Sequence, residues 1–132
     1  MLNDDPVALT ATLIDIESPS HHEAAIADVL EAELRGLSGV DVQRFGNTLV
    51  ARTNFGREQR VVLAGHVDTV PLADNTPHRI GPDVDGNETL FGCGAVDMKS
   101  GLACYLGAFA RLSQDPERAA FDLTLIAYEG EE

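Results

Sequence analysis

A histidine and an aspartate stand two residues apart, directly after a short apolar run of the chain. The run covers residues 60–65, and His66 and Asp68 follow it. We predict that the run is a buried strand, and in open α/β sheets functional groups gather where strands end. On an extended chain both side chains point to the same side, so the carboxylate can orient the imidazole and raise its basicity. A strand-end histidine with a polar neighbour is also common in structural roles, so this pair alone does not define a site.

Carboxylates occupy two further places of the same kind. Asp97 lies in the glycine-rich stretch 92–101, at the start of a predicted helix. The adjacent Glu131 and Glu132 follow a second apolar run at residues 121–128. Glycines around a carboxylate favour close approach of the backbone to a bound group. Taken singly, Asp97 also fits a helix cap, and the two glutamates also fit a solvated acidic tail.

Together the three segments predict a metal site at one edge of one sheet. The side chains are imidazole and carboxylate with no thiolate, a set that suits zinc, manganese or cobalt. A pair of ions about 3.5–4 Å apart needs a shared carboxylate, and Asp97 is the natural bridge. A phosphate-binding loop is the rival interpretation, because Lys99 and Ser100 resemble the end of such a loop. That pattern requires glycines where Cys93 and Met98 stand, so it is disfavoured.

The elements that position these residues follow from apolar spacing and turn residues. The second predicted helix begins with a capping box, in which Ser20 is the cap and Glu23 its partner. Residues 71–88 are rich in Pro, Asp, Asn and Gly and are expected to form a long loop. Helices that alternate with buried strands predict a three-layer α/β fold in a single domain. The predicted helices cover residues 6–18, 20–36 and 98–112. The predicted strands cover residues 40–45, 48–52, 60–65 and 121–128, and a further short strand is expected at residues 90–91.

Composition narrows the class of protein. The 132 residues include 22 acidic and 9 basic side chains, so the formal net charge is -13. This charge argues against binding to nucleic acid or to a membrane surface. The acidic N-terminus does not resemble a signal peptide, and no apolar run is long enough to span a bilayer. Cys93 and Cys104 match no metal or redox motif, and we expect both to be reduced and packed, which favours a cytoplasmic protein.

The three chemical segments also resemble the motifs of a known family. Residues 65–71, 92–101 and 128–132 are similar in order and spacing to the motifs of the M20 family of metallopeptidases. The resemblance extends over essentially the whole chain. Residues 46–48 and 73–75 look most like the succinyl-diaminopimelate desuccinylases of actinobacterial kind within that family. Acetylornithine deacetylases and aminoacyl carboxypeptidases share the three motifs and stay as alternatives.

The resemblance implies a role for each candidate residue. His66 would bind one of two divalent metal ions, Glu132 would bind the other, and Asp97 would bridge them. Zn²⁺ is the expected metal, with Co²⁺ and Mn²⁺ as alternatives. Glu131 would be the general base that takes a proton from water, and Asp68 would orient and polarise His66.

The resemblance also implies what lies beyond this sequence. The family supplies a further carboxylate and a histidine ligand, and a second domain for dimerisation, from later in the chain. Residues 1–132 are therefore expected to be the N-terminal portion of a three-layer, zinc-peptidase-like catalytic domain. Its parent would be a homodimer acting on a small N-acyl amino acid, and its Asp97–Met98 peptide bond would be cis. Alone, the chain is expected to bind metal weakly and to turn over little or no substrate.

A different class of protein is the second interpretation: an inactive fragment or a non-catalytic binding module that kept the fold. A decayed copy should have lost some of the five candidate residues. All five are present, which favours an active parent.

Overall fold

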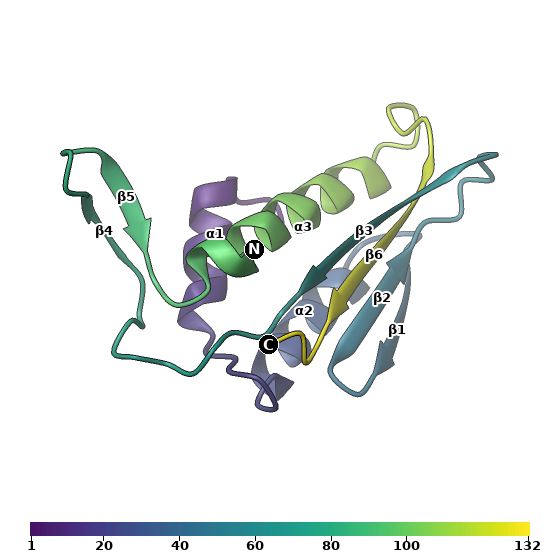
Figure 1. Cartoon of the computed structure of the whole chain (residues 1–132). Coiled ribbons are helices and arrows are strands. Elements are labelled where there is room, and N and C mark those ends of the chain that lie inside the picture. Colours follow the sequence, from purple (N-terminus) through teal and green to yellow (C-terminus); the bar gives the residue numbers. More distant parts are fainter.

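The central sheet of the molecule has four strands in the spatial order β1–β2–β6–β3. The computed structural model describes residues 1–132, and its strands here are β1 (Asp41–Phe45), β2 (Thr48–Arg52), β6 (Asp122–Tyr128) and β3 (Arg60–His66). β2 is antiparallel to both β1 and β6, whereas β3 runs parallel to β6 (Figure 1). Because β3 and β6 are parallel, the segments that follow them leave the sheet at the same edge.

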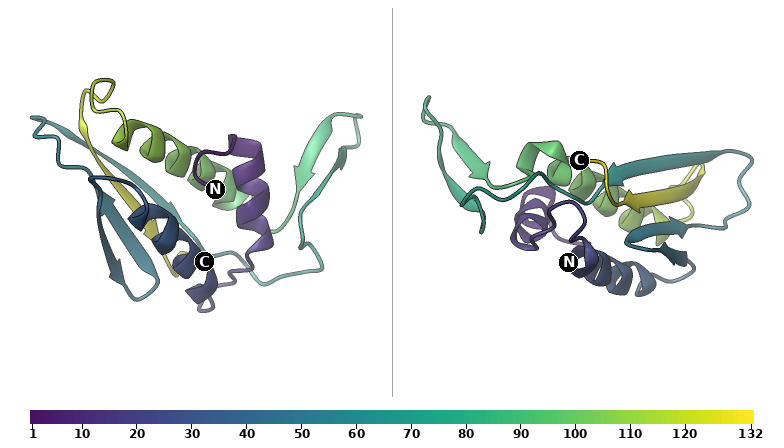
Figure 2. Two further views of the ribbon diagram at one scale, coloured as in Figure 1. Left: turned by 180° about the vertical axis from the view of Figure 1, so that it is seen from behind. Right: turned by 60° about the horizontal axis from the view of Figure 1, so that its bottom comes forward.

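Two helices, α2 (Ala24–Arg35) and α3 (Ser100–Ser113), pack on one face of this sheet (Figure 2). A third helix, α1 (Pro6–Asp15), packs mainly against α3. The alternate residues Leu123, Leu125 and Ala127 of β6 face the helices and are at most 5% exposed. None of the helices is long and apolar enough to cross a membrane.

The opposite face of the sheet is open to solvent. Val62 of β3 is 54% exposed there, and Phe45 of β1 is 60% exposed. Strand side chains alternate between faces, so these residues point away from the helices. The prediction that residues 60–65 form a buried strand is wrong, because β3 lies at the edge of the sheet. The α/β class predicted from the sequence is confirmed, and the chain supplies the sheet and one helical layer of the three layers expected.

Two helix starts show how local signals compete with contacts from distant segments. α1 begins where predicted, and Asp5 accepts hydrogen bonds from two backbone N–H groups of its first turn. α2 begins at Ala24, later than predicted, and Glu23 at the cap position makes no capping hydrogen bond. The predicted capping box is wrong, because the Ser20 hydroxyl donates to Asp68 instead, at 2.6 Å.

A second, two-stranded sheet begins within the region predicted to be a loop and ends at the short strand expected at residues 90–91. It consists of β4 (Arg79–Pro82) and β5 (Glu88–Phe91), which pair in antiparallel fashion and project from the body of the molecule (Figures 1 and 2). At its turn, Asp83 accepts hydrogen bonds from the backbone N–H groups of Asp85 and Asn87. The turn residues dominate the composition of residues 71–88 and conceal β4, whereas the short strand expected at residues 90–91 lies within β5.

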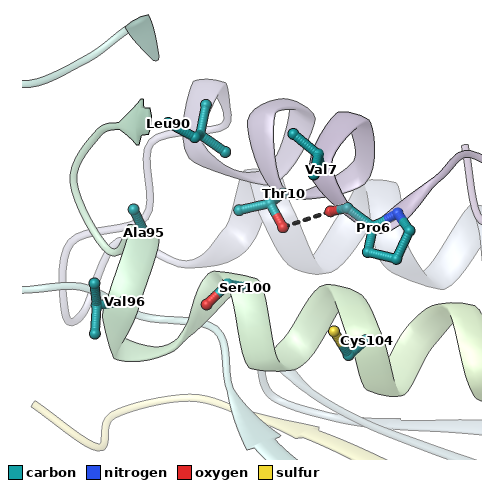
Figure 3. Close-up of a pocket in the computed structure, with 8 residues that line it drawn as sticks. All are labelled: Pro6, Val7, Thr10, Leu90, Ala95, Val96, Ser100 and Cys104. Atoms are coloured by element: carbon teal, nitrogen blue, oxygen red, sulfur yellow. Dashed lines mark hydrogen bonds between the residues drawn. The ribbon is translucent and has the colours of Figure 1, made fainter. Parts of the chain in front are cut away.

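An apolar hollow of about 290 Å³ lies between this hairpin, α1 and α3 (Figure 3). Cys104 on its wall is exposed, contrary to the expectation that both cysteines are packed, whereas Cys93 is buried. Both are free thiols. None of the five candidate residues lines the hollow, which is formed by Pro6, Val7, Thr10, Leu90, Ala95, Val96, Ser100 and Cys104.

A single π turn, η1 (Ala95–Lys99), leads into α3. Asp97 and Met98 within it have non-helical backbone angles, so α3 begins at Ser100, slightly later than predicted. The peptide bond between Asp97 and Met98 is cis, as the family resemblance implied.

Far from the predicted site, Asp122 anchors the start of β6 to the loop after β2. Its carboxylate accepts hydrogen bonds from the Thr53 hydroxyl at 2.7 Å and from the N–H groups of Phe55 and Arg57 at 2.6 and 2.8 Å. Burial raises the pKa of Asp122, but these hydrogen bonds and the charge of Arg60 outweigh it and lower the pKa to about 2.

The lowered pKa of Asp122 makes stability depend on pH in the acid range. The folded-state pKa lies below the unfolded value of about 3.9, so the contribution is present above pH 4 or so and is lost as pH falls toward about 2. We expect Asp122→Asn to lower the free energy of unfolding near neutral pH and to converge with the wild type at acid pH. Urea unfolding across this range measures both curves. The control Asp85→Asn, in the exposed hairpin turn, should show the same pH dependence of the free energy of unfolding as the wild type. A difference in this free energy between the wild type and Asp122→Asn that stays constant with pH would contradict the role given to Asp122.

Candidate metal centre

Parallel pairing of β3 and β6 brings two of the three predicted segments together. His66, the last residue of β3, is paired with Tyr128, the last residue of β6, and Glu131 and Glu132 follow shortly after. The π turn η1 brings Asp97 to the same place. One ligand atom from each of His66, Asp97 and Glu132 lies within 4.8 Å of the others. The structure therefore gathers, into one cluster, residues that are up to 66 positions apart (132 minus 66) in the sequence.

The imidazole of His66 is held at both nitrogens. Nδ1 lies 3.0 Å from the backbone oxygen of Asp68 and 3.3 Å from its carboxylate. Nε2 lies 2.9 Å from Asp97 Oδ1 and 3.8 Å from Glu131 Oε2. An Nδ1–H that donates to Asp68 leaves Nε2 directed at the cluster, as a metal-binding histidine requires.

Both imidazole nitrogens thus face oxygen acceptors. Burial lowers the pKa of His66, but hydrogen bonds to Asp97 and to the backbone oxygen of Asp68 outweigh it and raise the pKa. A proton on Nε2 satisfies the Asp97 carboxylate in this arrangement. A divalent cation bound between Nε2 and Asp97 satisfies the same atoms, so the donor set fits a metal ion.

Asp68 is fully buried and joins three parts of the site. Its carboxylate accepts hydrogen bonds from the Ser20 hydroxyl at 2.6 Å and from the N–H groups of Glu131 and Glu132 at 3.1 and 2.9 Å. Burial raises the pKa of Asp68, but these hydrogen bonds outweigh it and lower the pKa. The ionised carboxylate thus lies beside Nδ1 of His66 and also fixes the backbone that carries both glutamates.

Two further carboxylates hold the segment after β6. Glu23 is 1% exposed, and its Oε1 accepts a hydrogen bond from the N–H of Gly130 at 3.1 Å. Glu129 Oε2 accepts one from the N–H of Asn47 in the turn between β1 and β2, at 3.0 Å. These contacts orient the backbone immediately before Glu131.

Sequence reasoning did not assign Ser20 and Glu23 to the site. The sequence pattern predicts a helix cap for both, because a serine followed three residues later by a glutamate matches that pattern. Ser20 and Asp68 are 48 residues apart, and Glu23 and Gly130 are 107 apart, so no local pattern could reveal either contact.

The cluster is a site of concentrated negative charge that opens to solvent. The side chain of Asp97 is 72% exposed and that of Glu131 is 47% exposed, whereas the His66 side chain is 4% exposed. Carboxylates gathered around one imidazole repel one another unless a cation lies among them. Three donors are the minimum that zinc sites use for one ion, so a pair of ions requires donors beyond these.

A hollow of about 510 Å³ adjoins the cluster and includes two of its members in the wall. Asp97 and Glu132 line one part of it, and the apolar side chains of Val70, Leu90 and Phe91 line another. A small ligand seated there would contact both apolar groups and the candidate metal ligands.

The fold and the motifs place the chain in a class of metallohydrolases. The family model described as Peptidase family M20/M25/M40 matches residues 62–132, more than half of the chain. The chain belongs to this family.

Individual proteins of this kind are similar to the chain over nearly its whole length. The succinyl-diaminopimelate desuccinylase of Corynebacterium glutamicum is 55% identical over 130 residues, which cover 97% of this chain and 34% of the relative. A putative succinyl-diaminopimelate desuccinylase of Mycobacterium tuberculosis is 50% identical over 132 residues, which cover 99% of this chain and 35% of the relative. This chain spans about a third of the length of these relatives.

Solved structures of other proteins have the same fold as this chain. A tripeptidase from Staphylococcus aureus superimposes with a TM-score of 0.74 at 21% identity, covering 96% of this chain and 36% of that one. An M20 family metallo-carboxypeptidase from Sulfolobus solfataricus gives a TM-score of 0.72 at 20% identity, covering 98% of this chain and 31% of that one. The α/β architecture is therefore that of the M20 catalytic domain.

The hydrogen bond from Ser20 to Asp68 makes a specific prediction for stability. We expect Ser20→Ala to lower the free energy of unfolding by about 1–3 kcal/mol, because a buried carboxylate loses a donor. Urea denaturation measures the change. Ser38→Ala removes an exposed hydroxyl from a loop and should change little; equal effects of the two substitutions would rule out the proposed importance of the Ser20 contact.

Proposed function

We propose that this chain supplies part of the active site of a divalent-metal-dependent amide hydrolase that removes the succinyl group from N-succinyl-LL-diaminopimelate. The observation that carries the proposal is the convergence of His66, Asp97 and Glu132 within 4.8 Å beside the partly exposed carboxylate of Glu131. The desuccinylase names of relatives at 55% and 50% identity support this substrate over those of other family members. The products would be succinate and LL-diaminopimelate.

The proposed metal ligands are His66 Nε2 and the carboxylates of Asp97 and Glu132. Asp97 would be shared by two ions, and Zn²⁺ suits this set of nitrogen and oxygen donors best, ahead of Co²⁺ and Mn²⁺. When bound, such cations lower the pKa of water and polarise a carbonyl group. The buried Asp68 keeps His66 Nε2 directed at the cation.

Glu131 is the proposed general base. Its Oε2 lies 3.8 Å from His66 Nε2, and the side chain is 47% exposed, so a water molecule and a substrate can both reach it. The carboxylate takes a proton from the water whose oxygen bonds to the amide carbon. It then delivers that proton to the nitrogen as the carbon–nitrogen bond breaks, so succinate and a free amine leave.

Further groups are proposed to come from outside residues 1–132. Two ions need more than three donors, and the relatives are about three times as long as this chain. Additional ligands, a dimerisation domain and a homodimeric state of the full-length protein therefore belong to the proposal, as does its cytoplasmic location. On this basis the isolated chain binds metal weakly and has little or no activity.

Removal of the proposed shared ligand tests the metal centre directly. We expect calorimetry of the isolated chain to give weak Zn²⁺ binding that Asp97→Asn weakens at least about tenfold, because a neutral amide oxygen replaces the charged carboxylate among only three donors. Asp85→Asn carries the same change of charge away from the site and should bind as the wild type does. Equal affinity in all three chains, or no Zn²⁺ binding to the wild type, would count against this site.

The proposed base is tested in the full-length protein that carries this sequence. Glu131→Gln should lower kcat for succinyl-diaminopimelate by about 10²–10⁴-fold with little change in KM, because only proton transfer is removed. Steady-state kinetics on the succinyl and acetyl substrates provide both the measurement and the comparison of acyl groups. A variant with wild-type kcat would exclude Glu131 as the base, and a preference for acetylornithine would exclude the desuccinylase assignment.

A further inference from the structure

A buried lysine lies two residues after the proposed shared ligand and has no part in the reaction described above. Lys99 is 1% exposed. Its ammonium Nζ donates hydrogen bonds to the backbone oxygens of Leu13 and Ile16, at 2.7 and 2.9 Å, and it takes part in no ion pair. Lysine is seldom fully buried without a carboxylate partner, so this position requires a physical explanation.

The acceptors of Lys99 explain the need for a cation. Leu13 lies in the last turn of α1 and Ile16 is its C-cap residue, so both carbonyls belong to the helix end. The last carbonyls of a helix have no partner within the helix, and the helix dipole favours positive charge there. α1 has no basic residue in its own last turn. Lys99 supplies both the donors and the charge from a different element.

The end of α1 is also the anchor of the His66 segment. Just beyond the helix, the Ser18 hydroxyl donates to the backbone oxygen of Val67 at 2.7 Å, and the N–H of Thr69 donates to the Ser18 backbone oxygen at 2.9 Å. Ser20 then donates to Asp68. The residues that follow α1 therefore determine where the loop after β3 lies.

Close packing at Gly94 joins the loop after β3 to the turn η1. Gly94 has a φ of 77°, and a Cβ there would lie 2.7 Å from Thr69 Cγ2 and 3.5 Å from Lys99 Cδ. The stem of Lys99 and the side chain of Thr69 thus pack against one glycine, three residues before Asp97. The N–H of Lys99 donates to the Gly94 backbone oxygen at 2.8 Å and closes the π turn that carries Asp97.

We propose that Lys99 is a positioning residue: by tying the Asp97 turn to the C-terminal end of α1, it sets the position of Asp97 relative to His66. The end of α1 holds the loop after β3 through Ser18 and Ser20, and it holds the turn η1 through Lys99. The same end of α1 therefore positions both proposed metal ligands, His66 and Asp97. This inference rests on the proposed metal centre.

The test compares Lys99→Met with Arg111→Met on the isolated chain. Methionine keeps much of the length of the lysine side chain but removes its donors and charge. Arg111→Met makes the same change of charge on the exposed side of α3. Circular dichroism checks folding, and Lys99→Gln, which keeps a donor, serves if Lys99→Met does not fold. Two measurements follow. The first is Co²⁺ binding, with the visible absorption of the bound ion as the spectroscopic signature. The second is hydrogen exchange of the backbone amides of residues 95 and 99.

We expect Lys99→Met to bind Co²⁺ at least about tenfold more weakly, with an altered absorption band, because its ligands lose their relative position. Exchange at positions 95 and 99 should rise selectively, whereas amides of β6 keep their protection. Arg111→Met should match the wild type in both measurements. A variant that is merely less stable, with unchanged Co²⁺ affinity, unchanged band shape and a uniform rise in exchange, would overturn the positioning role.

Failure of the metal centre itself gives a different result. If the wild-type chain binds no Co²⁺, the proposed function fails. Hydrogen exchange alone then decides the role of Lys99. A selective rise at positions 95 and 99 then supports the tie between η1 and α1, and a uniform rise overturns it.

Discussion

The buried carboxylate of Asp68 is the constraint on which the rest of the site depends. A charge with no exposure to water must be satisfied by hydrogen bonds, each worth about 1.5–3 kcal/mol when the acceptor is charged. Asp68 obtains them from Ser20, which follows the first helix, and from Glu131 and Glu132, which follow the last strand. It also faces the imidazole of His66. One side chain therefore holds three segments of the chain at a common point.

This arrangement holds together groups that repel one another. Asp97, Glu131 and Glu132 approach a single histidine, in a chain that already has an excess of negative charge. No such gathering would form for its own stability, because each carboxylate raises the electrostatic energy of the others. The helices, the parallel pair of strands and the backbone contacts of Glu23 and Asp68 provide the free energy that keeps it in place. Unfavourable local chemistry that a fold maintains in this way is typical of functional sites.

Sequence patterns predicted those parts of the molecule that local physics controls. The second strand was expected at residues 48–52 and lies at Thr48–Arg52, since alternating side chains and flanking turn residues define it without help from other elements. The sequence also predicted the residues His66, Asp97 and Glu132 that the structure gathers, because each follows an apolar run or a glycine-rich turn. The contact of Ser20 and the strand β4 were not predicted. Ser20 matched a local cap pattern, but its partner is 48 residues away, and the turn composition of residues 71–88 outweighed the signal of β4.

The residues of the proposed site fall into two groups, one buried and one exposed to solvent. His66, Asp68, Glu23 and Lys99 are at most 3% exposed, and each makes hydrogen bonds that leave it one orientation. The carboxylates of Asp97 and Glu131 are 72% and 47% exposed, so solvent, a cation or a substrate can reach them. A buried polar side chain keeps one orientation, because losing its hydrogen bonds in the interior is costly. A side chain that reacts must instead be accessible to solvent and ligand. A sequence identifies the second group by chemistry, but the first group becomes evident only when the fold brings its distant partners together.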